Sequence, residues 1–362
     1  MKLLITSAES RKCFDIFNIL KPKFKNIYLC SDLGILRRSF LSIIYFKKVF
    51  KTEKILQLIK SQKLEIKIFP VEEIDIEAIY NLDLSSSSLL PDKDAFYCTV
   101  NKIHLFEHAT KNNIPTPQTL GADQLESNFI SDAVVVKPAR GMGSEGVKFF
   151  DNYDDATLYL NSINNSADML VQELIGKNNV IAGCFLFNKG TLVSYYGHER
   201  LRTYPKSGGV TVCSVSHNNQ RIMSLGQQLL APLEWSGLVM IEFMWSDLLN
   251  DYLLIEVNPR AWGSIMLSEK CGSNMIMSYV ELIFDNSVEK SLGQEGCYIR
   301  WLLPYDIVNL IKGNVPVSEY KYSNRENNCL INMSYSSLFR SVLFHIFQFT
   351  QFSKILRKVG IG

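Results

Sequence analysis

The chain has few of the features that mark several common protein classes. Its 38 basic and 36 acidic residues give a formal net charge of only +2, so no overall field argues for nucleic-acid binding. Its eight cysteines are scattered singly, without a CxxC pair or a Cys/His cluster at zinc spacing. We therefore expect buried, reduced thiols in a cytoplasmic protein, and neither a disulfide framework nor a zinc site.

Long apolar runs are missing as well. No stretch of the chain reaches the ~18 uncharged apolar residues that a membrane span requires. The N-terminal apolar run is too short for a signal peptide and is followed at once by polar residues. With 362 residues and 47% apolar content, the chain is long enough for roughly two or three domains with substantial cores.

A strand-helix-strand pattern opens the chain. Residues 2–6 and 26–30 are predicted strands, and residues 14–20 between them have the apolar spacing of a helix. The glycines of a dinucleotide-binding fingerprint are absent, so we expect a Rossmann-like unit that does not bind a dinucleotide. Residues 41–59 form an amphipathic, basic helical pattern. We expect it to pack with its lysines outward, and contact with a membrane or a partner is the alternative.

Polar side chains are concentrated where one apolar strand, residues 252–255, ends. The segment EVNPR follows, and Glu256 and Asn258 are two residues apart, so in an extended backbone both point to one face. Their oxygens could bind a single hard cation. Pro259 ends strand pairing and leaves the donors of Arg260 in a turn.

A second apolar strand, residues 237–243, carries one carboxylate, Glu242. If the turn-rich segment between the two strands makes a hairpin, Glu242 lies beside Glu256 and Asn258. The alternative is that Glu256 and Arg260 only form a surface ion pair after a strand.

A glycine-rich loop joins two further predicted strands. Residues 133–138 form an apolar strand that carries Lys137, the loop ARGMGSEG follows, and residues 147–150 form the next strand. The exposed amides of such a hairpin can fold over phosphates, with Lys137 as a point charge. Glycines also make bulges and tight turns, which is the alternative.

The remaining elements surround these motifs. A helix is predicted over residues 94–108, and it carries Lys102. Its two histidines have no third ligand at a plausible spacing, so we expect solvated or core histidines there. Residues 180–188 and 191–196 are predicted to form a hairpin. The polar stretch at 198–209 is either an anion clamp or a solvated basic loop.

The order of these elements resembles the ATP-grasp superfamily over roughly residues 1–290. The motifs that carry the resemblance are the lysine helix, the VVKP strand, the glycine hairpin, the VQELIG strand, Glu242 and EVNPR. The resemblance implies an α/β and α+β protein, with a Rossmann-like domain followed by an ATP-grasp fold whose two α+β subdomains hold ATP between them. The implied domains are a Rossmann-like domain at residues 1–93, an ATP-grasp domain at 94–290 and a C-terminal extension at 291–362. Within the ATP-grasp domain, the lid subdomain would cover about residues 120–175 and the metal-site subdomain about residues 176–290.

The resemblance also implies roles for individual residues. Two lysines would contact the ATP phosphates, Lys102 and Lys137. The lid loop over them would contain Arg140, Gly141, Gly143, Ser144 and Gly146. The strand that meets the adenine would be formed by Gln172, Glu173, Leu174 and Ile175. Asn179 stands where the family commonly has a ribose-binding glutamate.

The implied metal ligands are Glu242, Glu256 and Asn258, for Mg²⁺ or Mn²⁺. Arg260 would steady the transferred phosphate, and Arg202 is the candidate to hold an acyl phosphate. In this chemistry a substrate carboxylate attacks the terminal phosphoryl group of ATP, and an amine then displaces the phosphate. No side-chain nucleophile is needed, which agrees with the lack of a Ser/His/Asp or Cys/His set.

We therefore expect a ligase that joins a small carboxylate, preferably an amino acid, to an amine, without a nucleic-acid partner; homodimers are common in the family. One alternative is an enzyme of carboxyl or carbamoyl phosphate chemistry, which the lack of a glutaminase or biotin-bearing region disfavours. The other is a nucleotide-binding regulatory protein without turnover. The apolar and basic tail, residues 335–359, is predicted to lie on the inner face of a membrane, to dock on a partner, or to pack on its own chain.

Overall fold

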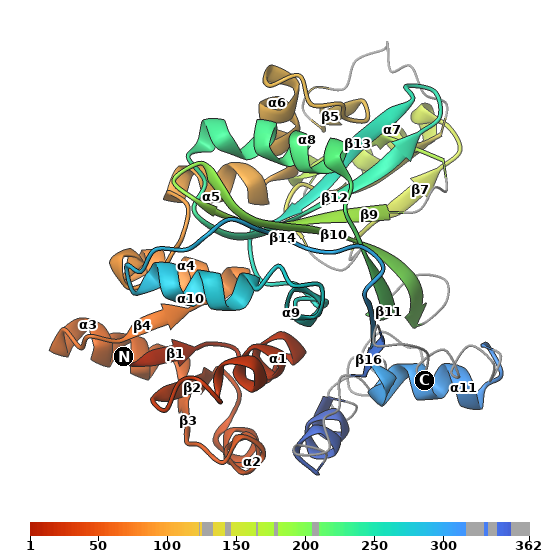
Figure 1. Ribbon diagram of the computed structural model, residues 1–362. Helices are drawn as coiled ribbons and strands as arrows, with labels where there is room; N and C mark the ends of the chain where they lie inside the picture. Colours follow the sequence, from red (N-terminus) through yellow and green to blue (C-terminus); the bar gives the residue numbers. More distant parts are fainter. Residues whose placement is uncertain are drawn as a thin grey trace.

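The computed structural model of this chain describes residues 1–122, 124, 133–141, 146–163, 166–176, 180–204, 210–315, 329–331 and 339–348. Three sheets organise these residues (Figure 1). A parallel sheet occupies the lower left of the view, and a long mixed sheet and a small antiparallel sheet lie above it. The predicted combination of α/β and α+β parts is confirmed.

The N-terminal unit is a parallel sheet in the order β3-β2-β1-β4. Ser10 caps its first helix, because its side chain accepts a hydrogen bond from the Cys13 amide. Both predicted strands are present, and the Rossmann-like arrangement is confirmed. The elements are β1 (Leu3–Ile5), α1 (Arg11–Leu20), β2 (Ile27–Ser31), α2 (Ile35–Tyr45), β3 (Val49–Lys51), α3 (Thr52–Gln62), β4 (Lys67–Phe69) and α4 (Glu73–Asn81).

The prediction of one helix over residues 41–59 is wrong. α2 ends at Tyr45, because Phe46 adopts a left-handed conformation with φ 51°. The chain then forms β3, where Val49 pairs with Leu29 of β2, before α3 begins at Thr52. A strand this short does not interrupt the apolar periodicity on either side of it, so the pattern alone could not reveal it.

The small sheet has the order β5-β8-β6-β7, and its strands pair antiparallel. β6 and β7 form the predicted hairpin around the glycine loop, with Val135 opposite Phe149. Residues Ala156 and Leu160 of α7 (Tyr153–Ser162) pack into the core of this sheet. The strands are β5 (Thr119–Gly121), β6 (Val134–Pro138), β7 (Lys148–Phe150) and β8 (Met169–Glu173).

The helix predicted over residues 94–108 is two helices, α5 (Lys93–Val100) and α6 (Lys102–Lys111). Asn101 separates them, and its side chain accepts hydrogen bonds from the amides of Ile103 and His104. Asn is a strong N-cap because its short side chain reaches these otherwise unpaired amides. The cap makes Lys102 the first residue of α6, where only 8% of it is exposed.

The large sheet has the order β13-β12-β9-β10-β11-β15-β16, with β14 beside β10. The predicted hairpin turn between β9 and β10 is confirmed: Lys189 and Gly190 have φ values of 48° and 73°, as a primed turn requires. The strands are β9 (Val180–Asn188), β10 (Thr191–Tyr204), β11 (Val210–His217), β12 (Gly237–Ser246), β13 (Asp251–Asn258), β14 (Ser291–Leu292), β15 (Tyr298–Arg300) and β16 (Cys329–Ile331).

The polar stretch at 198–209 is not a loop over its first half. β10 continues to Tyr204 and pairs with β11 from Gly197 onward, so the arginines of this stretch stand on a strand. Residues 205–209 lie outside the described residues. The register shifts on both sides of Arg202, and this irregularity hides the two-residue alternation that would have predicted a strand.

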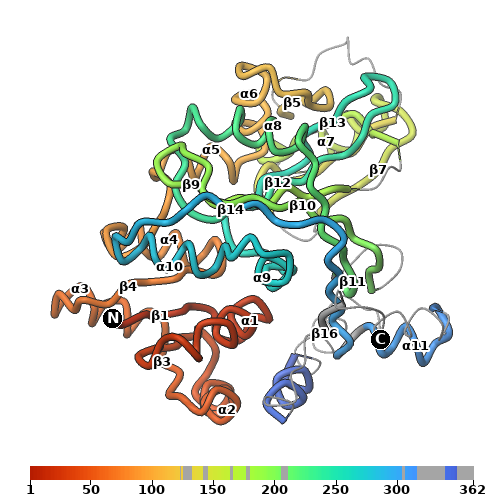
Figure 2. Tube along the Cα trace, in the orientation of Figure 1, coloured from red at the N-terminus to blue at the C-terminus, as the bar shows by residue number. Residues whose placement is uncertain are grey.

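Helices join the large sheet to the N-terminal unit. α10 (Met275–Ile283) runs between the parallel sheet and the large sheet (Figure 2). The ring of Tyr279 on α10 lies 4.5 Å from that of Phe69, and its hydroxyl donates to the Leu89 carbonyl at 3.0 Å. The C-terminal half of the chain also contains α8 (Gln220–Leu230), α9 (Met266–Lys270) and α11 (Ile307–Ile311).

A helix at residues 339–348 packs against the N-terminal unit. The ring of Phe344 stacks on Phe14 of α1 at 4.3 Å, and the ring of Phe347 lies 6.0 Å from Phe40 of α2. This part of the tail therefore packs on the chain itself, and residues 349–359 lie outside the described residues. In the described ranges no helix has the length and apolar character to cross a bilayer.

Replacing Phe344 with Ala should destabilise this packing, because the buried ring fills space between α1 and the C-terminal helix. We expect a loss of about 3 kcal/mol in the free energy of unfolding, typical of a buried Phe truncation. Urea unfolding followed by tryptophan fluorescence measures it. Phe339→Ala, on the same helix but 67% exposed, is the control. Equal midpoints for the two variants would contradict the described packing.

Candidate active site

A cavity of about 280 Å³ lies between the small sheet and the β12–β13 pair. Its walls come from α6, β6, β7, β8, β12 and β13, which are far apart in the sequence. The structure brings nine of the predicted site residues to this cavity, and they are Lys102, Lys137, Gly141, Gln172, Glu173, Leu174, Ile175, Glu242 and Glu256.

Two carboxylates face each other on one wall. β12 and β13 pair so that Glu242 is directly opposite Glu256, as the hairpin prediction requires. Burial raises the pKa of Glu242, and the charge of Glu256 raises it further, while Arg200 opposes the shift. Carboxylate oxygens from Glu242 and Glu256 on one wall are suitable ligands for a divalent cation.

The third predicted metal ligand, Asn258, is placed differently. Asn258 is paired opposite Met240 and is 5% exposed, and it is not among the residues that line the cavity. Its Oδ1 accepts a hydrogen bond from Arg260 at 2.9 Å. Among the described residues, no three His, Cys, Asp or Glu side chains gather as a metal site would need. A cation held by Glu242 and Glu256 would therefore take further oxygen ligands from Asn258 or from a bound nucleotide.

Two lysines face the carboxylates from the opposite wall. Lys102 Nζ donates to the Gly141 carbonyl at 3.2 Å, and Lys137 Nζ donates to Gln172 Oε1 at 2.7 Å. Burial and the charge of Lys102 together lower the pKa of Lys137 to about 8, and the charge of Glu256 opposes this shift. Such paired cations in a buried site need an anionic ligand to balance them.

Gln172 to Ile175 lie along one side of the same cavity. The backbone amide of Leu174 donates to the Ala133 carbonyl at 3.0 Å, and Glu173 accepts from the Gln118 amide at 3.2 Å. This segment is therefore held by the small sheet on both sides. An adenine-sized ring would meet the apolar side chains of Leu174 and Ile175 here.

Sequence reasoning missed the apolar walls of the cavity, which include Val135, Phe149, Met244 and Ile255. Ile255 is the clearest case. Glu242 pairs with Glu256 and Phe243 pairs with Leu254, which leaves Ile255 without a partner residue in the β12 ladder. This bulge lets the adjacent residues Ile255 and Glu256 both line the cavity, against the normal alternation of a strand.

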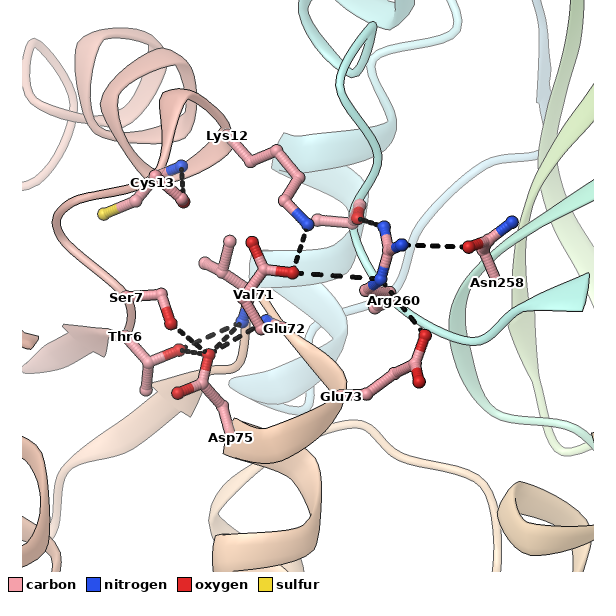
Figure 3. A network of polar contacts seen from close by, with 12 residues as sticks. Thr6, Ser7, Lys12, Cys13, Val71, Glu72, Glu73, Asp75, Asn258 and Arg260 are labelled. Atoms are coloured by element: carbon pink, nitrogen blue, oxygen red, sulfur yellow. Dashed lines mark hydrogen bonds and ion pairs between the residues drawn. The ribbon is translucent and has the colours of Figure 1, made fainter. Parts of the chain in front are cut away.

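Arg260 joins Asn258, at the end of β13, to the N-terminal unit (Figure 3). Its Nε lies 3.2 Å from Glu73 Oε1, and Glu72 is 3.8 Å away. Glu72 also forms an ion pair with Lys12 of α1. Burial raises the pKa of Glu73, and the charge of Arg260 opposes that shift. Burial, together with the nearby Arg260 charge, lowers the pKa of Lys12 to about 8.

Several predicted residues lie elsewhere. Arg140 points to the N-terminal unit, where it donates to Glu77 at 2.7 Å and lies over the Tyr97 ring. Arg202 Nε donates to the fully buried Asp306 at 2.8 Å, so the structure places it at the C-terminal segment. Gly146 ends the glycine loop with φ 75° and is not among the lining residues. Three predicted residues lie outside the described residues, and they are Gly143, Ser144 and Asn179.

Arg200 is a site residue that sequence reasoning missed. It stands on β10, reaches across β9 and forms an ion pair with Glu242 on β12. The polar composition of residues 198–202 marked the segment as unusual. Only the strand order β12-β9-β10 shows that one of its two arginines reaches the carboxylate wall.

Comparison with known proteins gives a family match and a set of structural neighbours. A family model of the ATP-grasp domain matches residues 99–264. No curated protein matches the chain. The biotin carboxylase domain of the Hydrogenobacter thermophilus 2-oxoglutarate carboxylase, solved with MgADP and bicarbonate, superposes with a TM-score of 0.64 at 13% identity, covering 82% of this chain and 73% of that one.

Two further neighbours are a synthetase and a ligase. The N5-carboxyaminoimidazole ribonucleotide synthetase from Thermotoga maritima has a TM-score of 0.58 at 17% identity and covers 80% of this chain and 77% of its own. The L-amino acid ligase from Bacillus licheniformis has a TM-score of 0.56 at 13% identity. The match covers 79% of this chain and 75% of the ligase. These superpositions establish a shared fold, and at identities this low they establish the fold alone.

The pKa of Lys137 predicts proton uptake when an anionic nucleotide binds. With a pKa of about 8, Lys137 is half neutral at pH 8, and a bound phosphate would restore its charge. We expect ATP binding at pH 8 to take up roughly half a proton. Calorimetry in two buffers of different ionisation enthalpy measures this quantity.

Two variants make the test specific to Lys137. Lys137→Arg should abolish the uptake, because a guanidinium stays charged. Lys12→Met should leave the uptake unchanged, since Lys12 has a similar pKa but is paired with Glu72 outside the cavity. Uptake that persists in Lys137→Arg would contradict the assignment.

The Arg200–Glu242 pair predicts competition with a metal ion. Arg200→Met removes a cation from Glu242, so we expect Mn²⁺ to bind roughly tenfold more tightly, because a hydrogen bond to a charged group contributes about 1.5 kcal/mol. Electron paramagnetic resonance of free Mn²⁺ measures the affinity. Arg221→Met, which removes a surface arginine paired with Asp251, should change nothing. Weaker Mn²⁺ binding in Arg200→Met would refute the competition.

Proposed function

Residues 99–264 of this chain form an ATP-grasp domain, and on that premise we propose that the protein is an ATP- and Mg²⁺-dependent ligase that joins a small carboxylic acid to an amine. One observation carries the proposal: Glu242 and Glu256 face each other in a cavity whose opposite wall holds Lys102 and Lys137. A nucleotide triphosphate with its cation matches this arrangement of charges, because its phosphates need the lysines and its metal needs the carboxylates.

The nucleotide would lie along the small sheet. Leu174, Ile175, Gly141 and Lys137 all line the cavity. The first two would offer an apolar surface to the base, and the last two would lie near the phosphates. The Gly141 carbonyl accepts a hydrogen bond from the Lys102 ammonium. This bond joins the start of the glycine loop to the lysine that would contact the phosphates. The loop between β6 and β7 would cover the phosphates with its backbone amides.

Glu242 and Glu256 would hold the magnesium ion, with Asn258 as a third oxygen donor, and the bound ion would offset the charge of the phosphates. Arg260 lies next to Asn258 and is fixed by Glu73 and Glu72 of the N-terminal unit. A guanidinium fixed from several sides needs little reorganisation when charge builds on a transferred phosphoryl group. In this proposal the N-terminal unit holds the arginine that would act on the transferred phosphate.

The reaction needs two displacements. An oxygen of the substrate carboxylate attacks the terminal phosphorus of ATP, the bond to ADP breaks, and an acyl phosphate forms. The amine nitrogen then attacks the acyl carbon, phosphate leaves, and the nitrogen loses a proton. Lysine and arginine charges stabilise the first displacement, and no covalent bond to the protein is required.

An amino acid is our proposed carboxylate substrate, and the fold shared with the L-amino acid ligase supports it. The second candidate is activation of bicarbonate as carboxyl phosphate, which the neighbour solved with bicarbonate favours. A screen that measures ADP release with amino acid and amine pairs, or with bicarbonate, followed by mass spectrometry of the product, separates the two. ADP release that depends only on bicarbonate would favour the second candidate.

Glu256→Gln should leave a folded protein with little turnover. The amide keeps the size of the side chain but removes the charge that holds the cation, a loss of about 3 kcal/mol, or more than 100-fold in rate. ADP release with the best substrate pair measures the effect. Glu289→Gln is the control, because Glu289 is exposed and does not line the cavity, and it should behave as the wild type. Wild-type turnover in Glu256→Gln would make the site assignment wrong.

A further inference from the structure

Helix α2 exposes a row of large apolar side chains. Four residues on it and at its end are strongly exposed: Ile35 at 70%, Leu36 at 84%, Ile43 at 57% and Phe46 at 72%. Leu36 and Ile43 are seven residues apart, two helical turns, so they share one face. We call the surface formed by these four residues the α2 face. Isolated exposed apolar residues are common, but several large ones on one face of a helix indicate an interaction site.

The α2 face is not needed for folding. The opposite side of the helix already supplies the core with Leu41, Ile44 and Tyr45. A helix that only packs on its own protein needs one apolar stripe and is polar elsewhere. α2 therefore carries a second apolar surface that its own fold leaves in solvent.

Basic side chains accompany the α2 face. Arg37, Arg38, Lys47 and Lys48 lie within or just after α2, and the sequence from residue 33 to residue 52 contains no Asp or Glu. Lys47 Nζ donates to the Lys25 carbonyl at 3.3 Å, which adds another lysine to this edge. The carboxylate just before the segment, Asp32, is paired with Lys51 at 2.9 Å. The local charge is thus strongly positive, although that of the whole chain is near zero.

The C-terminal helix lies beside α2 and also exposes apolar side chains. Phe347 stacks near Phe40 of α2, which places residues 339–348 beside α2. On that helix Ile346 is 53% exposed and Phe339 is 67% exposed. Figure 1 shows both helices at the lower end of the molecule, away from the small sheet that forms one wall of the cavity.

We propose that the α2 face binds the surface of an anionic lipid bilayer, with the apolar row inserted among the lipids and the basic residues at the headgroups. Exposed aliphatic and aromatic side chains beside lysines and arginines, without carboxylates, fit a surface that is both negatively charged and apolar beneath. The side chains project outward from one helix, which suits a deformable bilayer better than a protein partner that would need a matching groove. This placement leaves the small sheet, which forms one wall of the cavity, at the end of the molecule away from the membrane.

Vesicle flotation of the full chain tests the proposal. We expect binding to vesicles of phosphatidylcholine with phosphatidylserine, little binding to phosphatidylcholine alone, and weaker binding at high salt. Leu36→Ser/Ile43→Ser should reduce binding at least about tenfold by removing the inserted side chains. Both positions are exposed, so the thermal unfolding midpoint should not change.

A matched control removes two other exposed leucines. Leu248→Ser/Leu249→Ser alters the turn between β12 and β13, where the side chains are 89% and 55% exposed, and should bind vesicles as the wild type does. Equal binding by wild type and Leu36→Ser/Ile43→Ser would overturn the proposal. So would a wild-type chain that stays unbound with anionic vesicles, a result that would assign the α2 face to a protein partner.

Discussion

Two carboxylates, Glu242 and Glu256, oppose each other across β12 and β13, and the rest of the site depends on this pairing. Burial and the nearness of the second carboxylate raise the pKa of Glu242, so the pair needs cations around it. The chain supplies Arg200 as a direct partner, and Lys137 lies close enough to be affected by the charge of Glu256. A metal-nucleotide complex can take over this balance, because it brings one cation for the carboxylates and phosphates for the lysines.

The N-terminal unit contributes to the same balance of charges. Its Glu72 and Glu73 hold Arg260, which in turn donates to Asn258 at the end of β13 (Figure 3). The parallel sheet therefore contributes charged side chains beside the cavity as well as a support for it. Because these contacts join the two parts of the chain, the position of Arg260 depends on both of them.

Much of the fold and the centre of the site could be predicted from the sequence, because local patterns encode them. The strand after the glycine loop, the β9–β10 turn and the opposition of Glu242 and Glu256 follow from alternation and turn residues. The failures have long-range causes. Arg200 reaches Glu242 only through strand order, and Arg202 turns to Asp306, about a hundred residues later in the chain. Neither spacing nor composition contains that information.

The location of a bound metal ion tests the central claim most directly. Crystals grown with Mn²⁺ and ADP would give an anomalous difference peak at the manganese. The account predicts that the peak lies within coordination distance of the Glu242 and Glu256 carboxylates, with the nucleotide between β8 and β13. A peak at any other group of residues, or a nucleotide bound outside this cavity, would contradict it.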